Sequence, residues 1–101
     1  MINAIIEYAQ QQKIKVIFTR DKLFKAFCFD DNGKQYIVIN ETYFKSTEQL
    51  AAALLHEIGH CMTNAFYDIK LTPLSEQMEC EQKADEWANA HKDKILKTVN
   101  H

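Results

Sequence analysis

Two histidines and a glutamate stand close together in the apolar segment ALLHEIGHCM, residues 53–62. His56 and His60 are four residues apart, so on a helix their side chains lie one above the other on the same face. Two imidazole nitrogens placed in this way can bind one metal ion. Glu57 lies beside them, where a carboxylate can take a proton from a water molecule at the metal and pass it to a leaving amine. This HExxH pattern is typical of zinc metallopeptidases, so we expect Zn²⁺ as the cofactor.

The same three residues also allow a structural interpretation. The histidines would then be hydrogen-bonded helix residues, and Glu57 would be a solvated charge. Burying several polar groups without partners costs roughly 1–3 kcal/mol for each group, and the surrounding run is otherwise apolar. The metal interpretation is therefore favoured.

A catalytic zinc site typically has three protein ligands and one position open to water. Metzincins place a glycine and a histidine at fixed positions after the second histidine, whereas this chain has threonine and phenylalanine there, which excludes that class. A glutamate from a later helix is the alternative, and the segment at 80–88, CEQKADEWA, supplies Glu81. Asp85 lies one turn later on the same face and could accept a hydrogen bond from the outward N–H of a liganding imidazole. Other carboxylates that compete for the role of third ligand are Glu76, Glu79 and Glu86.

Tyr67 is a candidate for a further catalytic role. It lies eleven residues after His56, three turns along the same helical face, so it could support an oxyanion if the helix continues or its end bends inward. The structural alternative is a tyrosine that packs on the sheet with its hydroxyl in water. The sequence alone leaves both interpretations open.

The elements that must position these residues can be read from the spacing of apolar residues. Residues 2–11 have apolar side chains at helical spacing and predict a first helix. Residues 13–19 and 23–30 are rich in branched and aromatic residues, which indicates strands. A third strand at 35–40 is expected to return antiparallel after an Asp-Asn-Gly turn at 31–33.

Two longer helices are predicted to follow the strands. The first begins at Ser46 or Thr47, either of which can act as N-cap, runs to about Phe66 and carries the motif. The last begins near residues 72–75, beside the only proline, and continues into the nineties. The predicted fold is α+β, a minimal zincin-like domain in which an N-terminal helix, a small three-stranded, mostly antiparallel sheet, the central HExxH helix and a C-terminal helix form one unit.

The motif helix has a wide apolar arc that we expect to be buried. Gly59 interrupts it at a cost of about 1 kcal/mol relative to alanine, so we expect this glycine to permit close approach of a neighbouring backbone. On the last helix, Trp87 is expected in the core and His91 in a structural role. The residues expected to form the buried arc are Leu50, Ala51, Leu54, Leu55, Ile58, Cys61, Met62, Ala65 and Phe66.

Composition limits the possible functions. The 101 residues, 47% hydrophobic and 26% charged, suit a single metallopeptidase-like domain spanning 1–101. Twelve basic and fourteen acidic residues without a basic block argue against direct nucleic-acid binding. No segment has the length of a membrane span or the pattern of a signal peptide, so we expect no membrane partner and a cytoplasmic location. An odd number of cysteines without CxxC spacing suits buried free thiols, namely Cys28, Cys61 and Cys80.

The chain resembles the ImmA/IrrE family of small zinc-dependent metallopeptidases. The resemblance covers nearly the whole length, with HEIGH followed by AFY and then ExxADxWA as its most specific part. It implies zinc ligands at His56, His60 and Glu81, and the general base at Glu57. It also implies a cytoplasmic endopeptidase that cuts a helix-turn-helix repressor of a phage or mobile element. The segments that carry the resemblance are IIEYAQQQKIKV, YIVIN, LLHEIGHCMTNAFYDI and ECEQKADEWAN.

A non-catalytic regulatory or interaction module is the alternative function. Such a module would bind a repressor and use the metal only for stability. A closed structural site would need a fourth protein ligand, for which Cys61 or Cys80 are the candidates. The two functions differ in their response to Glu57→Gln, which should abolish cleavage in a peptidase and change nothing measurable in a binding module.

Overall fold

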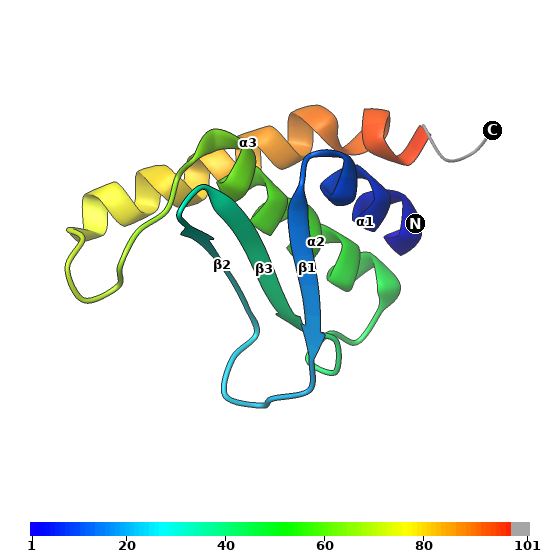
Figure 1. Ribbon diagram of the computed structural model, residues 1–101, viewed down its shortest axis with the longest axis horizontal. Helices are drawn as coiled ribbons and strands as arrows, with labels where there is room; N and C mark the ends of the chain where they lie inside the picture. Colours follow the sequence, from blue (N-terminus) through cyan, green and yellow to red (C-terminus); the bar gives the residue numbers. More distant parts are fainter. Residues whose placement is uncertain (98–101) are drawn as a thin grey trace.

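One helix, three strands and two further helices follow one another along the chain in the computed structural model, which describes residues 1–97 (Figure 1). The predicted α+β class and the predicted order of elements are confirmed. Within the described residues, no helix is both long and apolar enough to cross a lipid bilayer. The elements are α1 (Ile2–Gln11), β1 (Ile14–Thr19), β2 (Ala26–Asp31), β3 (Lys34–Asn40), α2 (Thr47–Thr63) and α3 (Leu74–Lys97).

The three strands form a mixed sheet in the order β1-β3-β2. β2 and β3 are antiparallel, as predicted, and Asn32 (φ 53°) and Gly33 (φ 85°) supply the positive φ angles of the turn between them. β1 and β3 are parallel, so the expectation of a mostly antiparallel sheet holds for only one of the two pairs. β3 runs in the direction of β1 because the chain reverses twice after β1. It lies in the centre of the sheet because it pairs with both other strands.

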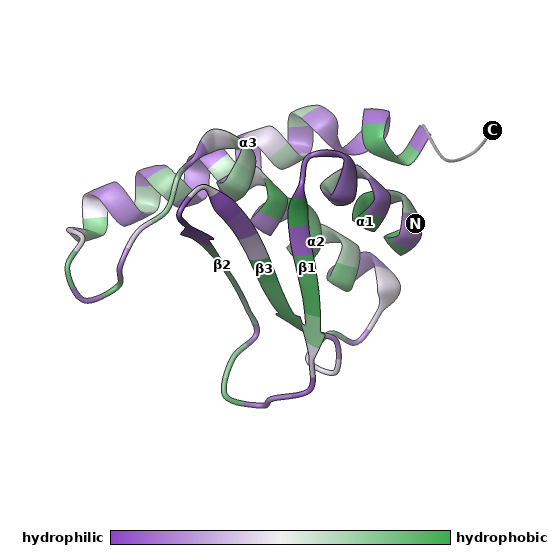
Figure 2. Ribbon diagram, in the orientation of Figure 1, coloured by the Kyte–Doolittle hydropathy of each residue, from purple (hydrophilic) through white to green (hydrophobic). Residues whose placement is uncertain are grey.

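The hydrophobic core lies between one face of the sheet and the helices. Ile37 and Ile39 of the central strand are fully buried there, against residues of α1, α2 and the end of α3. Figure 2 shows a mixture of hydrophilic and hydrophobic residues along α3, as expected for a helix that covers the core with one face. The opposite face of the sheet carries partly exposed apolar side chains, among them Ile17, Phe27 and Phe29.

Helix α2 has a defined cap at each end. The Ser46 hydroxyl accepts a hydrogen bond from the Gln49 amide at 3.2 Å, so Ser46, rather than Thr47, is the N-cap. At the other end Asn64 adopts a left-handed conformation, φ 54°, which stops the helix at Thr63. The prediction that the helix reaches Phe66 is therefore wrong by three residues.

The predicted buried arc of α2 is largely confirmed. Met62 is the exception, because it lies past the edge of the arc and is 38% exposed. The predicted role of Gly59 is confirmed as well, since a Cβ atom at this position would lie 2.5 Å from the Ala84 carbonyl oxygen. The backbones of α2 and α3 thus approach closely at this glycine, one turn from Glu81.

Candidate metal centre

The three predicted ligands meet where α2 and α3 cross. His56 and His60 project from successive turns of α2, and their Nε2 atoms are 3.1 Å apart. Glu81 of α3 places its Oε2 atom 2.7 Å from His56 Nε2 and its Oε1 atom 3.1 Å from His60 Nε2. The side chains of His56, His60 and Glu81 therefore form a group that could hold a metal ion.

The hydrogen bonds behind the imidazoles determine which ring nitrogens face the cluster as acceptors. His60 Nδ1 lies 2.8 Å from the carbonyl oxygen of Ala65, and His56 Nδ1 lies 2.7 Å from Asp85 Oδ1. A carbonyl and a carboxylate accept hydrogen bonds, so each Nδ1 must carry the proton of a neutral ring. Each Nε2 atom then directs a lone pair into the cluster, toward the other ring and the Glu81 carboxylate. A proton shared between two of these acceptors would relieve only one of the close contacts. A divalent cation could bind both Nε2 atoms and the Glu81 carboxylate together.

The spacing of the donors also fits a metal ion. Metal bonds of 2.0–2.1 Å in tetrahedral geometry put neighbouring donors about 3.3 Å apart, so only a small outward movement is needed here. Within residues 1–97 the cluster contains three protein donors and no cysteine. Cys61 is buried in the core, and the Cys80 thiol lies 4.0 Å from the Phe66 carbonyl oxygen. A bound ion would thus keep a position for water or substrate.

The other carboxylates of α3 lie outside this group. Glu86 accepts a hydrogen bond from Gln82 at 2.9 Å on the exposed side of the helix. Glu76 and Glu79, near the start of α3, are exposed and do not belong to the cluster. Of the four glutamates considered for the third ligand, the structure brings only Glu81 to the histidines.

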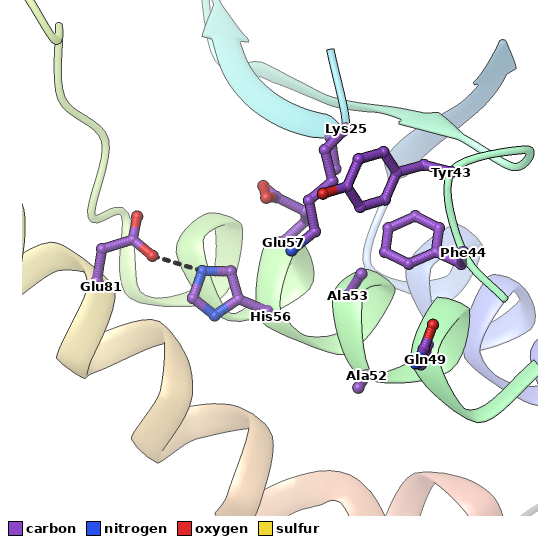
Figure 3. A pocket seen from close by; sticks show the side chains of 10 residues that line it. Lys25, Tyr43, Phe44, Gln49, Ala52, Ala53, His56, Glu57 and Glu81 are labelled. Atoms are coloured by element: carbon purple, nitrogen blue, oxygen red, sulfur yellow. Dashed lines mark hydrogen bonds and ion pairs between the residues drawn. The ribbon is translucent and has the colours of Figure 1, made fainter. Parts of the chain in front are cut away.

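Glu57 lies beside the ligands but is not one of them. In Figure 3 its carboxylate lies between the side chains of Glu81 and Lys25. The residue is 8% exposed, and it borders two of the cavities that flank the cluster. These cavities, of about 610 and 190 Å³, meet along Ala26 at the start of β2. Glu57 is thus a carboxylate with access to the space in which a substrate could lie.

Tyr67 reaches the cluster by a route that differs from the one predicted. Because α2 ends at Thr63, Tyr67 belongs to the following loop and not to a continued helical face. Its hydroxyl is not left to water but donates a hydrogen bond to Glu81 Oε1 at 2.8 Å. Burial, followed by this hydrogen bond, raises the pKa of Tyr67 to about 12, so the hydroxyl keeps its proton at neutral pH. Tyr67 is placed to hold the third ligand.

The sequence interpretation missed several residues around the centre. The Ala65 carbonyl could not be identified as the partner of His60, because its direction depends on where α2 ends. Tyr43 and Phe44, which line the larger cavity, lie in the segment before the N-cap of α2. The only available signal for them was an aromatic pair outside the predicted strands and helices.

Comparison with known proteins adds no assignment. The chain matches no protein-family model, and searches of curated proteins and of solved structures find no match either.

Proposed function

We propose that the protein is a zinc-dependent endopeptidase in which Glu57 acts as the general base. The observation that carries this proposal is the meeting of two imidazole lone pairs and one carboxylate, with no fourth protein donor within residues 1–97, beside a buried glutamate that borders a cavity. Three ligands and an open position are typical of catalytic zinc sites, whereas structural zinc sites are closed by four protein ligands. The geometry therefore favours a hydrolase over a module that uses the metal only for stability.

Hydrolysis would proceed by attack of water on a peptide carbonyl. A divalent ion held by His56, His60 and Glu81 would supply Lewis acidity, which makes water more acidic and polarises the carbonyl. Glu57 would take the proton from the attacking water as the oxygen–carbon bond forms, and would deliver it to the amine nitrogen as the carbon–nitrogen bond breaks. The products are a carboxylic acid and an amine, which ionise at neutral pH to a carboxylate and an ammonium group.

The surrounding residues would keep the ligands in the required form. Asp85 and the Ala65 carbonyl hold the protons on Nδ1 of the two imidazoles, which leaves both Nε2 atoms free to bind the ion. Tyr67 would fix the orientation of the Glu81 carboxylate through its hydrogen bond. These contacts position the ligands and take no part in bond breaking.

For the substrate we propose a helix-turn-helix repressor of a phage or mobile element, cut in the cytoplasm. The support for this choice is the resemblance of HEIGH, AFY and ExxADxWA to ImmA/IrrE peptidases. A repressor encoded beside the gene would be the first protein to test.

The deciding experiment compares the zinc-loaded protein with its Glu57→Gln variant on such a repressor. We expect the parent protein to cut the repressor into fragments that mass spectrometry identifies. The variant should retain one equivalent of zinc and lose cleavage by roughly 10²–10⁴-fold, because only the base is removed. Glu86→Gln, the same change at an exposed position of α3, is the matched control and should leave cleavage intact. Unchanged cleavage by Glu57→Gln would reject the assigned base, and a stable complex without cleavage by the parent protein would support the binding module.

A further inference from the structure

The larger cavity beside the candidate metal centre has apolar residues on its wall and floor, next to the polar residues of the centre. Tyr43 and Phe44 form one wall, with ring centroids 5.3 Å apart, and α2 contributes Ala52 and Ala53 to the floor. In Figure 3 the Ala53 side chain is directed toward Phe44, in the space between that ring and His56. Small side chains on the floor and rings on the wall leave room for a bulky group next to the reacting residues.

The volume of this cavity leaves room for a large side chain. It encloses about 610 Å³, within the range of about 300–1,000 Å³ usual for small-ligand sites. His56, Glu57 and Glu81 all border it, so a group bound there would lie beside the candidate centre. Tyr43 is 58% exposed, so part of its ring remains open to solvent at the edge of this cavity.

The charges around the cavity argue against a charged occupant. The Lys25 ammonium lies 5.6 Å from the ring centre of Tyr43 and 5.8 Å from that of Phe44, where cation–π attraction holds it. An acidic side chain would be repelled by the carboxylates of Glu57 and Glu81, although Lys25 would attract it. A basic side chain would be repelled by Lys25, although the two carboxylates would attract it. A neutral, apolar side chain meets neither conflict and gains the contact with the rings and alanines.

We propose that this cavity is the subsite for a bulky apolar side chain, aromatic or branched, of the substrate residue next to the scissile bond. The inference rests on the proposed peptidase function and adds a sequence preference to it. Tyr43, Phe44 and Ala53 are the residues that would determine this preference.

The test measures binding separately from cleavage. The zinc-loaded Glu57→Gln protein, labelled with ¹³C at its alanine methyl groups, is titrated with the peptides acetyl-Gly-X-Gly-amide, in which X is Phe, Leu, Ala, Asp or Lys. We expect the Phe and Leu peptides to bind about tenfold more tightly than the Ala peptide, as burial of a large apolar side chain implies. Their binding should shift the methyl signals of Ala53 and Ala26 and leave that of Ala90 unchanged.

Two variants assign the effect to the cavity. Ala53→Leu should fill the floor and weaken binding of the Phe peptide about tenfold, whereas Ala90→Leu, the same change at an exposed site on α3, should have no effect. Tyr43→Ala removes an exposed wall without loss of core packing, and it should also reduce the preference for Phe even if Ala53→Leu does not fold. Circular dichroism monitors folding of each variant.

The possible outcomes distinguish this inference from the proposed function. Equal affinities for all five peptides, a preference for Asp or Lys, or methyl shifts that exclude Ala53 would overturn the subsite. The expected binding preference without any hydrolysis by the parent protein would overturn the peptidase function but would leave the subsite in place. Hydrolysis of a protein substrate with no preference for large apolar residues would support the peptidase function and overturn the subsite.

Discussion

At the scale of single residues, the two candidate histidine ligands depend on different kinds of support. The Ala65 carbonyl that holds His60 belongs to a buried residue, whereas the Asp85 side chain that holds His56 is 67% exposed. The contact of His60 is therefore part of the core, and that of His56 can be changed without disturbing packing. This difference allows a direct test of how the outer hydrogen bond affects metal binding.

Asp85→Asn should weaken zinc binding by about 10–100-fold, because an amide is a poorer acceptor for the Nδ1 proton of His56. Competition with a chromophoric chelator measures the affinity. The melting temperature of the metal-free protein should hardly change, since the side chain is exposed. Asp93→Asn, an exposed change further along α3, is the control and should leave the affinity as it is. Equal zinc affinities in all three proteins would contradict the role assigned to Asp85.

Cys28 of β2 should be an unreactive thiol. A hydrogen bond with Cys61, burial and the nearby Glu57 carboxylate raise the pKa of the Cys28 thiol above its ordinary value. Since alkylating reagents attack the thiolate, Cys28 should react with iodoacetamide at pH 8 at least about tenfold more slowly in the native protein than in guanidinium-unfolded protein. Mass spectrometry of the Cys28 peptide follows the reaction, and equal rates in the two states would contradict the expectation.

The same shift has a consequence for stability at high pH. A pKa raised in the folded state means that the contribution of Cys28 is complete below the ordinary pKa of a thiol and is lost as pH rises beyond it. The free energy of unfolding of the parent protein, measured relative to that of Cys28→Ala, should therefore decrease as the pH rises above about 8.5.

Spacing alone was enough to predict the positions of His56, Glu57 and His60, because one helix of constant geometry contains all three. It did not suffice to select Glu81, since several glutamates on the same later helix satisfy the chain length equally well. The contact of Tyr67 with Glu81 was beyond prediction for another reason. It depends on a reversal at Asn64 that an apolar pattern continuing to Phe66 conceals.

At the scale of elements, the crossing of α2 and α3 controls the centre. Gly59 lets the two backbones approach, and Ala84 at the contact lies three residues after Glu81 on α3. A side chain at the crossing would have to push α3 outward, because the atoms it meets are backbone atoms that cannot rotate aside. The distance between the histidines and Glu81 is therefore set by the absence of one methyl group.

Gly59→Ala should destabilise the protein by roughly 1–3 kcal/mol, although helix propensity alone predicts stabilisation of about 1 kcal/mol. The sign of the change in melting temperature distinguishes the two effects. Zinc affinity should also fall, because Glu81 moves away with α3. Gly33→Ala is the control: its positive φ makes any side chain unfavourable, but it lies in the β2–β3 turn and should not alter zinc affinity. A Gly59→Ala protein with a higher melting temperature and normal zinc binding would contradict the close contact.

At the scale of the whole molecule, most of the core lies apart from the candidate ligands, of which only His60 is buried. The fully buried residues, such as Ile37, Ile39 and Leu54, lie between the sheet and the helices, and none of them is a candidate ligand. Folding should therefore depend on apolar burial, and the metal should add to stability without being required for it.

Removal of metal by a chelator should leave the far-ultraviolet circular dichroism spectrum largely unchanged. Zinc at about 100 times its dissociation constant should add about 2.7 kcal/mol to the free energy of unfolding, which raises the melting temperature by roughly 10–20 °C. Thermal unfolding with and without zinc measures the shift. Loss of the spectrum on chelation would instead favour a metal required for folding, as in the non-catalytic alternative.

The sequence predicts the helices and strands themselves better than it predicts how they are arranged in space. The positions of the six elements follow from apolar spacing, the Asn-Gly turn and the capping residue Ser46. The parallel pairing of β1 with β3 does not follow from the sequence pattern. These strands are not consecutive in the chain, so their pairing depends on tertiary packing and not on local sequence. The exposed position of Met62 has a similar cause, since the width of the buried arc depends on the shape of the sheet beneath it.

The division of the ligands between two helices also determines the order in which the centre can assemble on the ribosome. Glu81 follows His56 by 25 residues, and it lies in a helix whose contact with α2 requires still later residues to emerge from the exit tunnel. A nascent chain therefore carries both imidazoles before it has the carboxylate that completes the set. Binding of an ion by all three candidate ligands would therefore become possible only after translation has passed through α3.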